Sequence, residues 1–359
     1  MATANEILLN ESVAHNIDLQ AYSLNELRRI LALLNRTDPD LLAAIESAVD
    51  KGQGQGFNVQ RLNDLLKSVR EINAEVYKEI VDRLGIDLKD LTDYEAGYQY
   101  QLFRSVLPEV VPISTVNINQ VYAAAMARPF QGKLLKEFLS DLETSRAIAI
   151  RDAIRMGYVE GQTTDQIVRR IRGTRALNYA DGLLQVSRRN LETVVLTAIS
   201  HTASYARDAV FEANSDIIKA DRYTATLDMR TTVLCASRDG NEYPKGKPKP
   251  ALPAHMRCRS VYVPVLKSWR EMGAAIDIEM PASTRASLDG QVPGKMTYQE
   301  WLKKQSVSRQ NEVLGVDKAK LFRDGGLSLD KFVARNGHVF TLQELRERDS
   351  KAFTRAGLQ

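Results

Sequence analysis

The sequence predicts a mainly α-helical protein that carries one small α+β module. Three observations predict this fold class. Apolar residues recur at helical spacing through the first two thirds of the chain. The period changes to alternation near residue 216, as in a strand. From Thr297 onward, short segments are each punctuated by Gly or capped by Ser or Thr. At 359 residues we expect an extended, multi-lobe helical architecture ending in a C-terminal arm of short helices.

Residues 1–110 predict an acidic, helical N-terminal lobe. A helix over 23–36 has Ser23 at the position of its N-cap. A second helix starts at Thr37 and Asp38, with Pro39 in its first turn, and stops at Gly52. The sequence GQGQG at 52–56 predicts a flexible connector. A third helix of about seven turns then fills 58–85, with one apolar stripe along it.

Residues 111–215 predict the next helical segment. Pro108 and Pro112 place a boundary near 110. Long helices are expected over 132–161 and 184–216, with a short helix over 163–173 between them. Residues 216–270 form the small β-containing module, with strands over 219–228 and 259–266 on either side of a loop. Residues 271–359 form the short-helix extension.

Composition limits the class of protein. No apolar run approaches the roughly 18–20 residues that a membrane helix needs, and the first residues lack the features of a signal peptide. Two cysteines are too few for a secreted disulfide scaffold, so a reducing interior is expected, with one disulfide as the alternative. Residues 1–110 hold 11 Lys/Arg against 18 Asp/Glu, whereas residues 216–270 hold 11 against 5. The basic segment either keeps a loop soluble, through Lys245, Lys247 and Lys249, or contacts phosphate or an acidic partner.

Both cysteines of the chain lie in this basic segment, beside a histidine. His255 and Cys258 form one close pair, H-x2-C, and 19 residues separate Cys235 from His255. Structural zinc sites use four such ligands at tetrahedral geometry, usually as two close pairs. The partner expected near Cys235 is absent, so Asp228, Asp239 or water would complete the set. The alternative is that the cysteines are small buried hydrophobic residues and His255 is an ordinary loop residue.

The run from Thr224 to Leu266, TATLDMRTTVLCASRDGNEYPKGKPKPALPAHMRCRSVYVPVL, resembles a motif of phage head morphogenesis proteins. These are the minor head proteins of the Mu F-protein and SPP1 gp7 type, and the resemblance extends over roughly residues 110–350. The matching positions are Asp228, Arg230, Thr231, Cys235, Asp239, Gly240, Pro253, His255, Cys258 and Arg259. Two departures stand out: Thr232 and Ser260 occupy positions where many members have cysteine. A four-cysteine-type zinc site is therefore excluded.

The resemblance implies a minor structural head protein of a tailed bacteriophage. Such a protein acts in the virion, inside the head near the portal, and in the host cytoplasm during assembly. Its expected partners are the portal protein and the major capsid or scaffold proteins, and phage DNA through non-specific phosphate contacts. No DNA-contacting residue is singled out. The resemblance also favours a structural zinc ion on Cys235, His255 and Cys258, with Asp228 as the fourth ligand.

The competing class is a zinc- or magnesium-dependent nuclease or other hydrolase centred on His255. The other histidines, His15, His201 and His338, are far from it in sequence, and no nucleophile, nucleotide-binding or H-E-x-x-H motif is present. We therefore expect no enzyme and no catalytic residue. A sequence-specific zinc DNA-binding domain is the weakest class, because the residues between Cys235 and His255 show no recognition-helix pattern.

Overall fold

The computed structural model describes residues 4–50, 59–268, 271–272 and 284–358, so the connector expected at 52–56 lies outside the described residues. The chain divides into two compact units. Unit 1 comprises Met1–Gln20, Asp93–Val121 and Ala203–Gln359, and unit 2 comprises Ala21–Thr92 and Tyr122–Thr202. The predicted fold class, mainly α with a small α+β module, is confirmed. The described helices include none with the length and apolar character of a membrane span.

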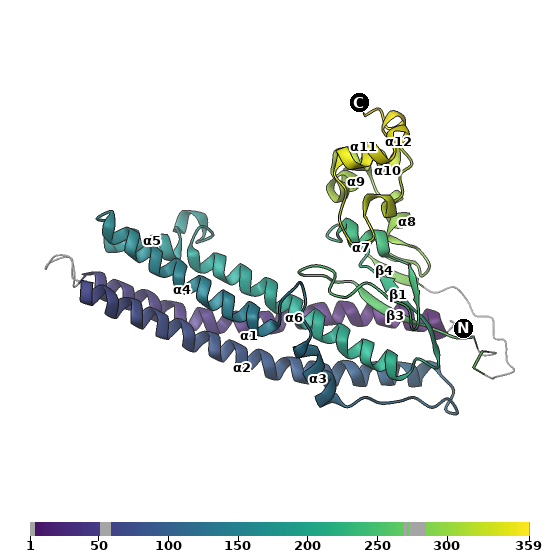
Figure 1. Ribbon diagram of the computed structural model, residues 1–359, viewed down its shortest axis with the longest axis horizontal. Helices are drawn as coiled ribbons and strands as arrows, with labels where there is room; N and C mark the ends of the chain where they lie inside the picture. The colour runs from purple at the N-terminus through teal and green to yellow at the C-terminus, as the bar shows by residue number, and fades with distance from the viewer. Residues whose placement is uncertain (1–3, 51–58, 269–270, 273–283, 359) are drawn as a thin grey trace. The chain divides into compact units, whose positions relative to one another are not determined.

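Unit 2 is helical, and some of its helices continue into unit 1 (Figure 1). The helices in chain order are α1 (Ala4–Asp50), α2 (Val59–Val106), α3 (Ile118–Ala127), α4 (Leu135–Val159), α5 (Thr164–Arg172), the 3-10 helix η1 (Arg175–Leu177) and α6 (Leu183–Ala213). Buried Leu, Ile and Val side chains from α1, α2, α4, α5 and α6 form the core of unit 2. This core follows from the apolar stripes, because residues three and four apart share one face of a helix.

The helix ends expected at Ser23 and at Thr37–Asp38 are wrong, because α1 is continuous through both places and through Pro39. The hydroxyl of Thr37 donates to the carbonyl of Leu33 one turn earlier (2.7 Å), so it does not cap a helix start. The carboxylate of Asp38 forms ion pairs with Arg146 and Arg188, which are far from it in the sequence. Likewise, α2 does not stop near residue 85 but runs on to Val106.

Those ion pairs form a buried charged centre in unit 2. Asp38 of α1 accepts from Arg146 of α4 through one carboxylate oxygen and from Arg188 of α6 through the other. Asp38 and Arg146 are almost completely buried, whereas the Arg188 side chain is a quarter exposed. Two guanidinium groups thus share one carboxylate inside the helical core. A buried ion pair rarely adds net stability, but removal of one partner is strongly destabilising.

Unit 1 contains the predicted module, built on a three-stranded antiparallel sheet in the order β2-β1-β3. The strands are β1 (Ile218–Thr224), β2 (Glu242–Pro244) and β3 (Val261–Leu266), and Tyr223 of β1 lies opposite Tyr262 of β3. Between β1 and β2 lies a short helix, α7 (Val233–Arg238), where the sequence predicted loop. A hairpin of β4 (Thr284–Ser287) and β5 (Gly290–Pro293), which the sequence did not predict, joins the module through a bridge between Leu227 and Ser287.

The short helices expected at the C-terminus are present in unit 1 (Figure 1), and they share a hydrophobic core with part of the module. They are α8 (Tyr298–Lys303), α9 (Val307–Leu314), α10 (Val316–Arg323), the 3-10 helix η2 (Leu329–Phe332), α11 (Leu342–Arg348) and α12 (Ser350–Arg355). Trp301 is buried in this core, with Leu227 and Ala236 of the module among its other members. Thr297 and Thr341 cap α8 and α11 through capping boxes, as the sequence predicts.

Polar side chains connect the elements of unit 1. Asp239 after α7 accepts from both terminal nitrogens of Arg285 on β4, and from the backbone N–H groups of Ala225 (2.6 Å) and Tyr298 (2.7 Å). One carboxylate therefore joins the end of β1, the hairpin and the start of α8. Hydrogen bonds also join α1 to β3 at two points. Asn5 accepts from the N–H of Leu266 (2.7 Å), and Asn16 donates to the carbonyl of Arg259 just before β3 (2.9 Å).

Candidate metal centre

Cys235 and Cys258 are brought together by two short segments of unit 1. Cys235 lies on α7, whose first turn is capped by the hydroxyl of Thr232 accepting from the N–H of Cys235 (3.4 Å). Cys258 lies in the turn before β3, where its own N–H donates to the carbonyl of His255 (3.2 Å). Both cysteines are 2% exposed, belong to the hydrophobic core around the sheet, and are free thiols.

The three candidate ligands converge as the sequence predicted. The Sγ atom of Cys235 lies 3.8 Å from Sγ of Cys258 and 3.2 Å from Nε2 of His255, and the ligand atoms of all three residues lie within 4.8 Å of one another. Two thiolates on a tetrahedral zinc ion are about 3.8 Å apart, and a thiolate and an imidazole nitrogen about 3.6 Å. These three residues could therefore hold a metal ion; the Sγ–Sγ distance equals that of a zinc site, and the distance from Sγ of Cys235 to Nε2 of His255 is shorter than in one.

The hydrogen bonds of His255 orient its ring for this role. Nδ1 lies 2.8 Å from the carbonyl oxygen of Met256, which accepts only, so Nδ1 carries a proton. Nε2 faces Sγ of Cys235 and the hydroxyl of Thr232, which lies 3.0 Å away. It carries a lone pair in the neutral ring, and a proton that it donates to Sγ when Cys235 is a thiolate. A second hydrogen bond that fixes the tautomer in this way is typical of metal-ligating histidines.

The surroundings of Cys235 favour its thiolate form. Hydrogen bonds from Cys258 and His255 lower the pKa of the Cys235 thiol well below its usual value, against the effect of burial. The hydroxyls of Tyr223 and Ser260 act in the same direction, and Tyr223 donates to Sγ over 3.2 Å. The Cys258 thiol, which donates to Cys235 and is buried, has its pKa raised. Hydrogen bonding to Cys235 raises the pKa of His255. A thiolate is the form of cysteine that binds metals.

Asp228, the expected fourth ligand, is not part of this group. Arg259 donates to both of its carboxylate oxygens, over 2.5 and 2.8 Å, and the N–H of Arg230 also donates to it. These donors lower the pKa of Asp228 although burial opposes them. Sequence spacing could not reveal this pairing, because the guanidinium comes from a residue 31 positions away.

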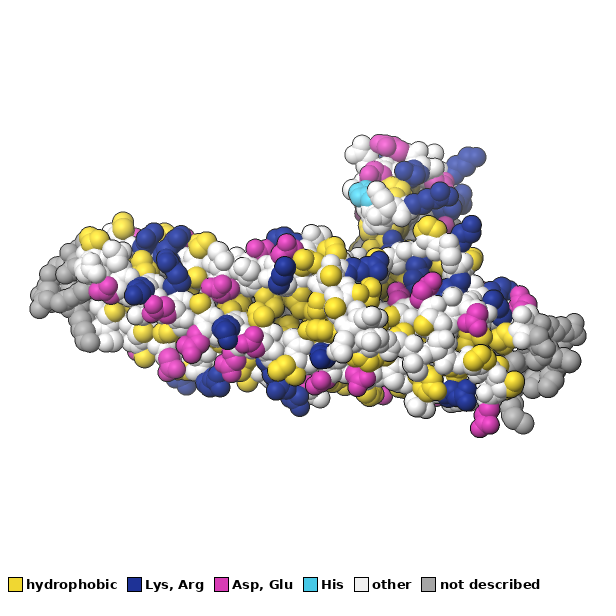
Figure 2. Space-filling view, turned by 60° about the horizontal axis from the view of Figure 1, so that its bottom comes forward, with side chains coloured by type: hydrophobic (Ala, Val, Ile, Leu, Met, Phe, Trp, Pro, Cys, Tyr) yellow, Lys and Arg dark blue, Asp and Glu magenta, His cyan; other side chains and the backbone are white. Residues whose placement is uncertain are grey.

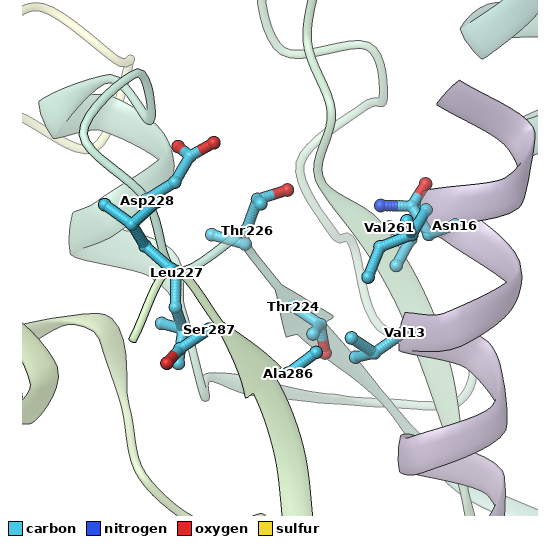
Figure 3. A pocket seen from close by; sticks show the side chains of 12 residues that line it. Val13, Asn16, Thr224, Thr226, Leu227, Asp228, Val261, Ala286 and Ser287 are labelled. Carbon is cyan, nitrogen blue, oxygen red and sulfur yellow. The ribbon is translucent and has the colours of Figure 1, made fainter. Parts of the chain in front are cut away.

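Asp228 also lines a separate hollow of about 200 Å³ beside α1. Its carboxylate points away from Val13 and Ala286, which lie on the far side of that hollow (Figure 3). The hollow is mainly apolar and contains none of the three candidate ligands. It therefore offers no alternative metal position.

Space for a fourth metal ligand exists elsewhere, in a cavity of about 20 Å³ against Cys235 and His255. One water molecule needs roughly 10–15 Å³ of such space. Thr232 and Ser260, the positions where the sequence departs from the motif it resembles, also line this cavity. The cavity thus has room for one water molecule and presents hydroxyl groups beside Cys235 and His255. The sequence reasoning missed Tyr223, although its alternation on β1 placed it on the buried face.

The hydrogen-bond partners of the four histidines bear on the hydrolase alternative. Both ring nitrogens of His255 have partners, and among the described residues no carboxylate belongs to the Cys–His group. The other three histidines are engaged elsewhere: His15 with Glu95, His201 with the carbonyl of Ala125, and His338 with Glu344. General acid–base catalysis needs a group within hydrogen-bond reach of the reacting proton.

Of the loop lysines Lys245, Lys247 and Lys249, two form ion pairs within unit 1. Lys249 pairs with Asp208 and Asp221 (2.8 Å each) and lies over the ring of Tyr262. Lys245 pairs with Asp221 (3.3 Å) and Glu212 (3.7 Å). Lys247 is exposed. The positive charge of 216–270 is thus partly balanced by acidic residues, and Lys245 and Lys249 tie the loop to α6 and β1.

Comparisons with protein-family models, curated proteins and solved structures found no match to this chain. Its function must therefore be argued from the residues and geometry above.

Proposed function

We propose that this chain is a minor structural head protein of a tailed bacteriophage, in which Cys235, His255 and Cys258 hold a structural zinc ion. The convergence of two buried sulfurs and one oriented imidazole, at spacings suited to zinc, carries the metal assignment. The resemblance of the motif and its flanking helices carries the assignment to phage heads. A bound zinc ion would cross-link α7 to the turn before β3, so that binding free energy adds to folding free energy.

A structural role fits the site better than catalysis. The sulfurs are buried, and the adjoining space is large enough for about one water molecule but not for a substrate. A nuclease centred on His255 would need a free ring nitrogen or a nearby carboxylate as base. Neither is available in the group of described residues. We propose the fourth ligand to be a water molecule or the hydroxyl of Thr232, in place of Asp228.

The partners of the proposed function are the portal protein and the major capsid or scaffold proteins, inside the head near the portal. Contact with packaged DNA would be made through phosphates, without sequence reading. On the face shown in Figure 2, side chains of both charges are interspersed over the helices of unit 2, whereas Lys and Arg gather on one side of the C-terminal helices. That basic surface supports a weak, salt-sensitive DNA contact.

The metal assignment is tested by zinc content and thermal unfolding of the purified full chain. Wild type should carry a stoichiometric amount of zinc, and chelation should lower its Tm by about 5 °C or more. Cys258→Ser should lose both the zinc and the response to chelator. Asp228→Asn should keep the zinc, and Thr232→Cys should bind it more tightly because a thiolate replaces a hydroxyl. A wild-type Tm that is unchanged by chelation would contradict the zinc assignment.

The assignment to phage heads is tested by quantitative mass spectrometry of purified particles and procapsids of the encoding phage. A low, fixed ratio of this chain to the portal protein is the expected result. Its absence from both particles would remove the structural assignment, and nuclease activity with Mg²⁺ or Mn²⁺, compared with that of His255→Ala, would then be the measurement that decides.

A further inference from the structure

A pocket of about 230 Å³ lies in unit 1, separate from the candidate metal centre. Its walls come from β1, from the turn at Gly240, from the loop before α8, and from Leu9 of α1. None of Cys235, His255 and Cys258 lines it. The pocket is smaller than the roughly 300–1,000 Å³ of typical sites for drug-sized ligands, and several times the about 30 Å³ that one water molecule occupies. Its size suits a small ion or one chemical group of a larger ligand.

All the charged side chains that line this pocket are positively charged. Arg222, Arg285 and Lys295 all line it, and no Asp or Glu does. The carboxylate partners of the two arginines, Glu242 and Asp239, lie outside the lining. Lys295 is exposed and has no ion-pair partner among the described residues. A concave site lined by one sign of charge concentrates ions of the opposite sign.

Arg285 is held rigidly in the wall of the pocket. Its side chain is 4% exposed, and its two terminal nitrogens donate to Asp239 and to the carbonyls of Ala225 and Met296. The third nitrogen, Nε, is buried and has no hydrogen-bond partner among the described residues. An unmet donor on a buried guanidinium is costly unless an acceptor is supplied. Arg222 differs in being partly exposed, with Nε and one terminal nitrogen donating to the exposed carboxylate of Glu242.

We propose that this pocket is a phosphate-binding subsite. Arg222 and Lys295 bind the oxyanion directly, and Arg285, whose charge is balanced by Asp239, forms a rigid part of the wall. Arginine and lysine together suit this ligand, since the guanidinium offers paired donors and the ammonium a compact charge. The phosphate belongs either to free phosphate or to the phosphodiester backbone of DNA. The inference does not depend on the zinc ion, because it uses none of the metal-centre residues.

Isothermal titration of the full-length chain with inorganic phosphate, at low ionic strength, tests the proposal. We expect saturable binding by wild type, and a loss of affinity of about tenfold in Lys295→Ala and in Arg222→Ala. The matched control is Lys303→Ala, an exposed lysine on α8 that does not line the pocket. This control should bind phosphate as wild type does.

A second titration, with a short DNA duplex, identifies the source of the phosphate. If DNA competes with inorganic phosphate and binds about tenfold more weakly to Lys295→Ala than to Lys303→Ala, the subsite takes a backbone phosphate. If DNA does not compete, the ligand is free phosphate. Absence of saturable phosphate binding by wild type, or equal affinities in Lys295→Ala and Lys303→Ala, would overturn the proposal. Either result would leave the zinc measurement unaffected.

Discussion

Unit 2 and the sheet-containing part of unit 1 are held together in different ways. In unit 2, long helices bury a continuous core of aliphatic side chains, and the polar centre at Asp38 is one feature within a large apolar interface. In unit 1, strands of three to seven residues and short helices are joined by single polar side chains, such as Asp239, that reach several elements at once. Short elements have few neighbours of their own, so individual polar links matter more there.

The largest effect is expected from Asp239→Ala in unit 1. The change leaves the buried guanidinium of Arg285 without its carboxylate and two backbone N–H groups without an acceptor. We expect the free energy of unfolding of unit 1 to fall by about 5 kcal/mol. Fluorescence of Trp301 during urea unfolding, in a Trp269→Phe background that leaves one tryptophan, reports on this unit. Asp330→Ala, an exposed carboxylate, is the control, and equal stabilities of the two variants would refute the role of Asp239.

Asp38→Ala should destabilise unit 2 by about 4 kcal/mol, because two guanidinium groups lose their shared partner. The decrease in unfolding free energy should be somewhat smaller than for Asp239→Ala. The Arg188 side chain is partly exposed, so its guanidinium can form hydrogen bonds with solvent when Asp38 is absent. Helical circular dichroism during urea unfolding measures it. If Arg188→Met were to cost as much as Asp38→Ala, hydration of Arg188 would not explain the difference between the two units.

Acid should weaken unit 1 through Glu95, which sits on α2 and pairs with Arg207 of α6 and His15 of α1. Burial raises the pKa of Glu95, but the charge of Arg207 and the hydrogen bond from His15 outweigh it and lower the pKa to about 2. A carboxylate with a depressed folded-state pKa stabilises the fold above its unfolded pKa, near 4.5, and this contribution disappears as pH falls to about 2. It amounts to about 3 kcal/mol.

The check is the difference in unfolding free energy between wild type and Glu95→Gln, followed with pH. This difference should be constant above pH 5 and should shrink steadily below about pH 4.5. A difference that does not change with pH down to 3 would contradict the assignment of the low pKa to Glu95.

The sequence predicted those parts of the molecule that depend on local pattern. The apolar stripes placed the helices, alternation placed β1, a β-branched run placed β3, and residue type grouped Cys235 with His255 and Cys258. Helix ends at Thr37 and Asp38 were mispredicted, because both residues are good caps in isolation and only the fold brings Arg146 and Arg188 to Asp38. Asp228, predicted as the fourth ligand, lies outside the Cys–His group, because the fold brings Arg259 to its carboxylate.

The two asparagines of α1 that hold β3 have a consequence for the order of folding. Asn5 and Asn16 lie at the start of the chain, and their partners Leu266 and Arg259 follow 261 and 243 residues later. During synthesis every residue of unit 2, which ends at Thr202, leaves the ribosome before β3 has been made. The helical unit can therefore assemble first. The hydrogen bonds of Asn5 and Asn16 to residues 266 and 259 can form only after β3 has been translated.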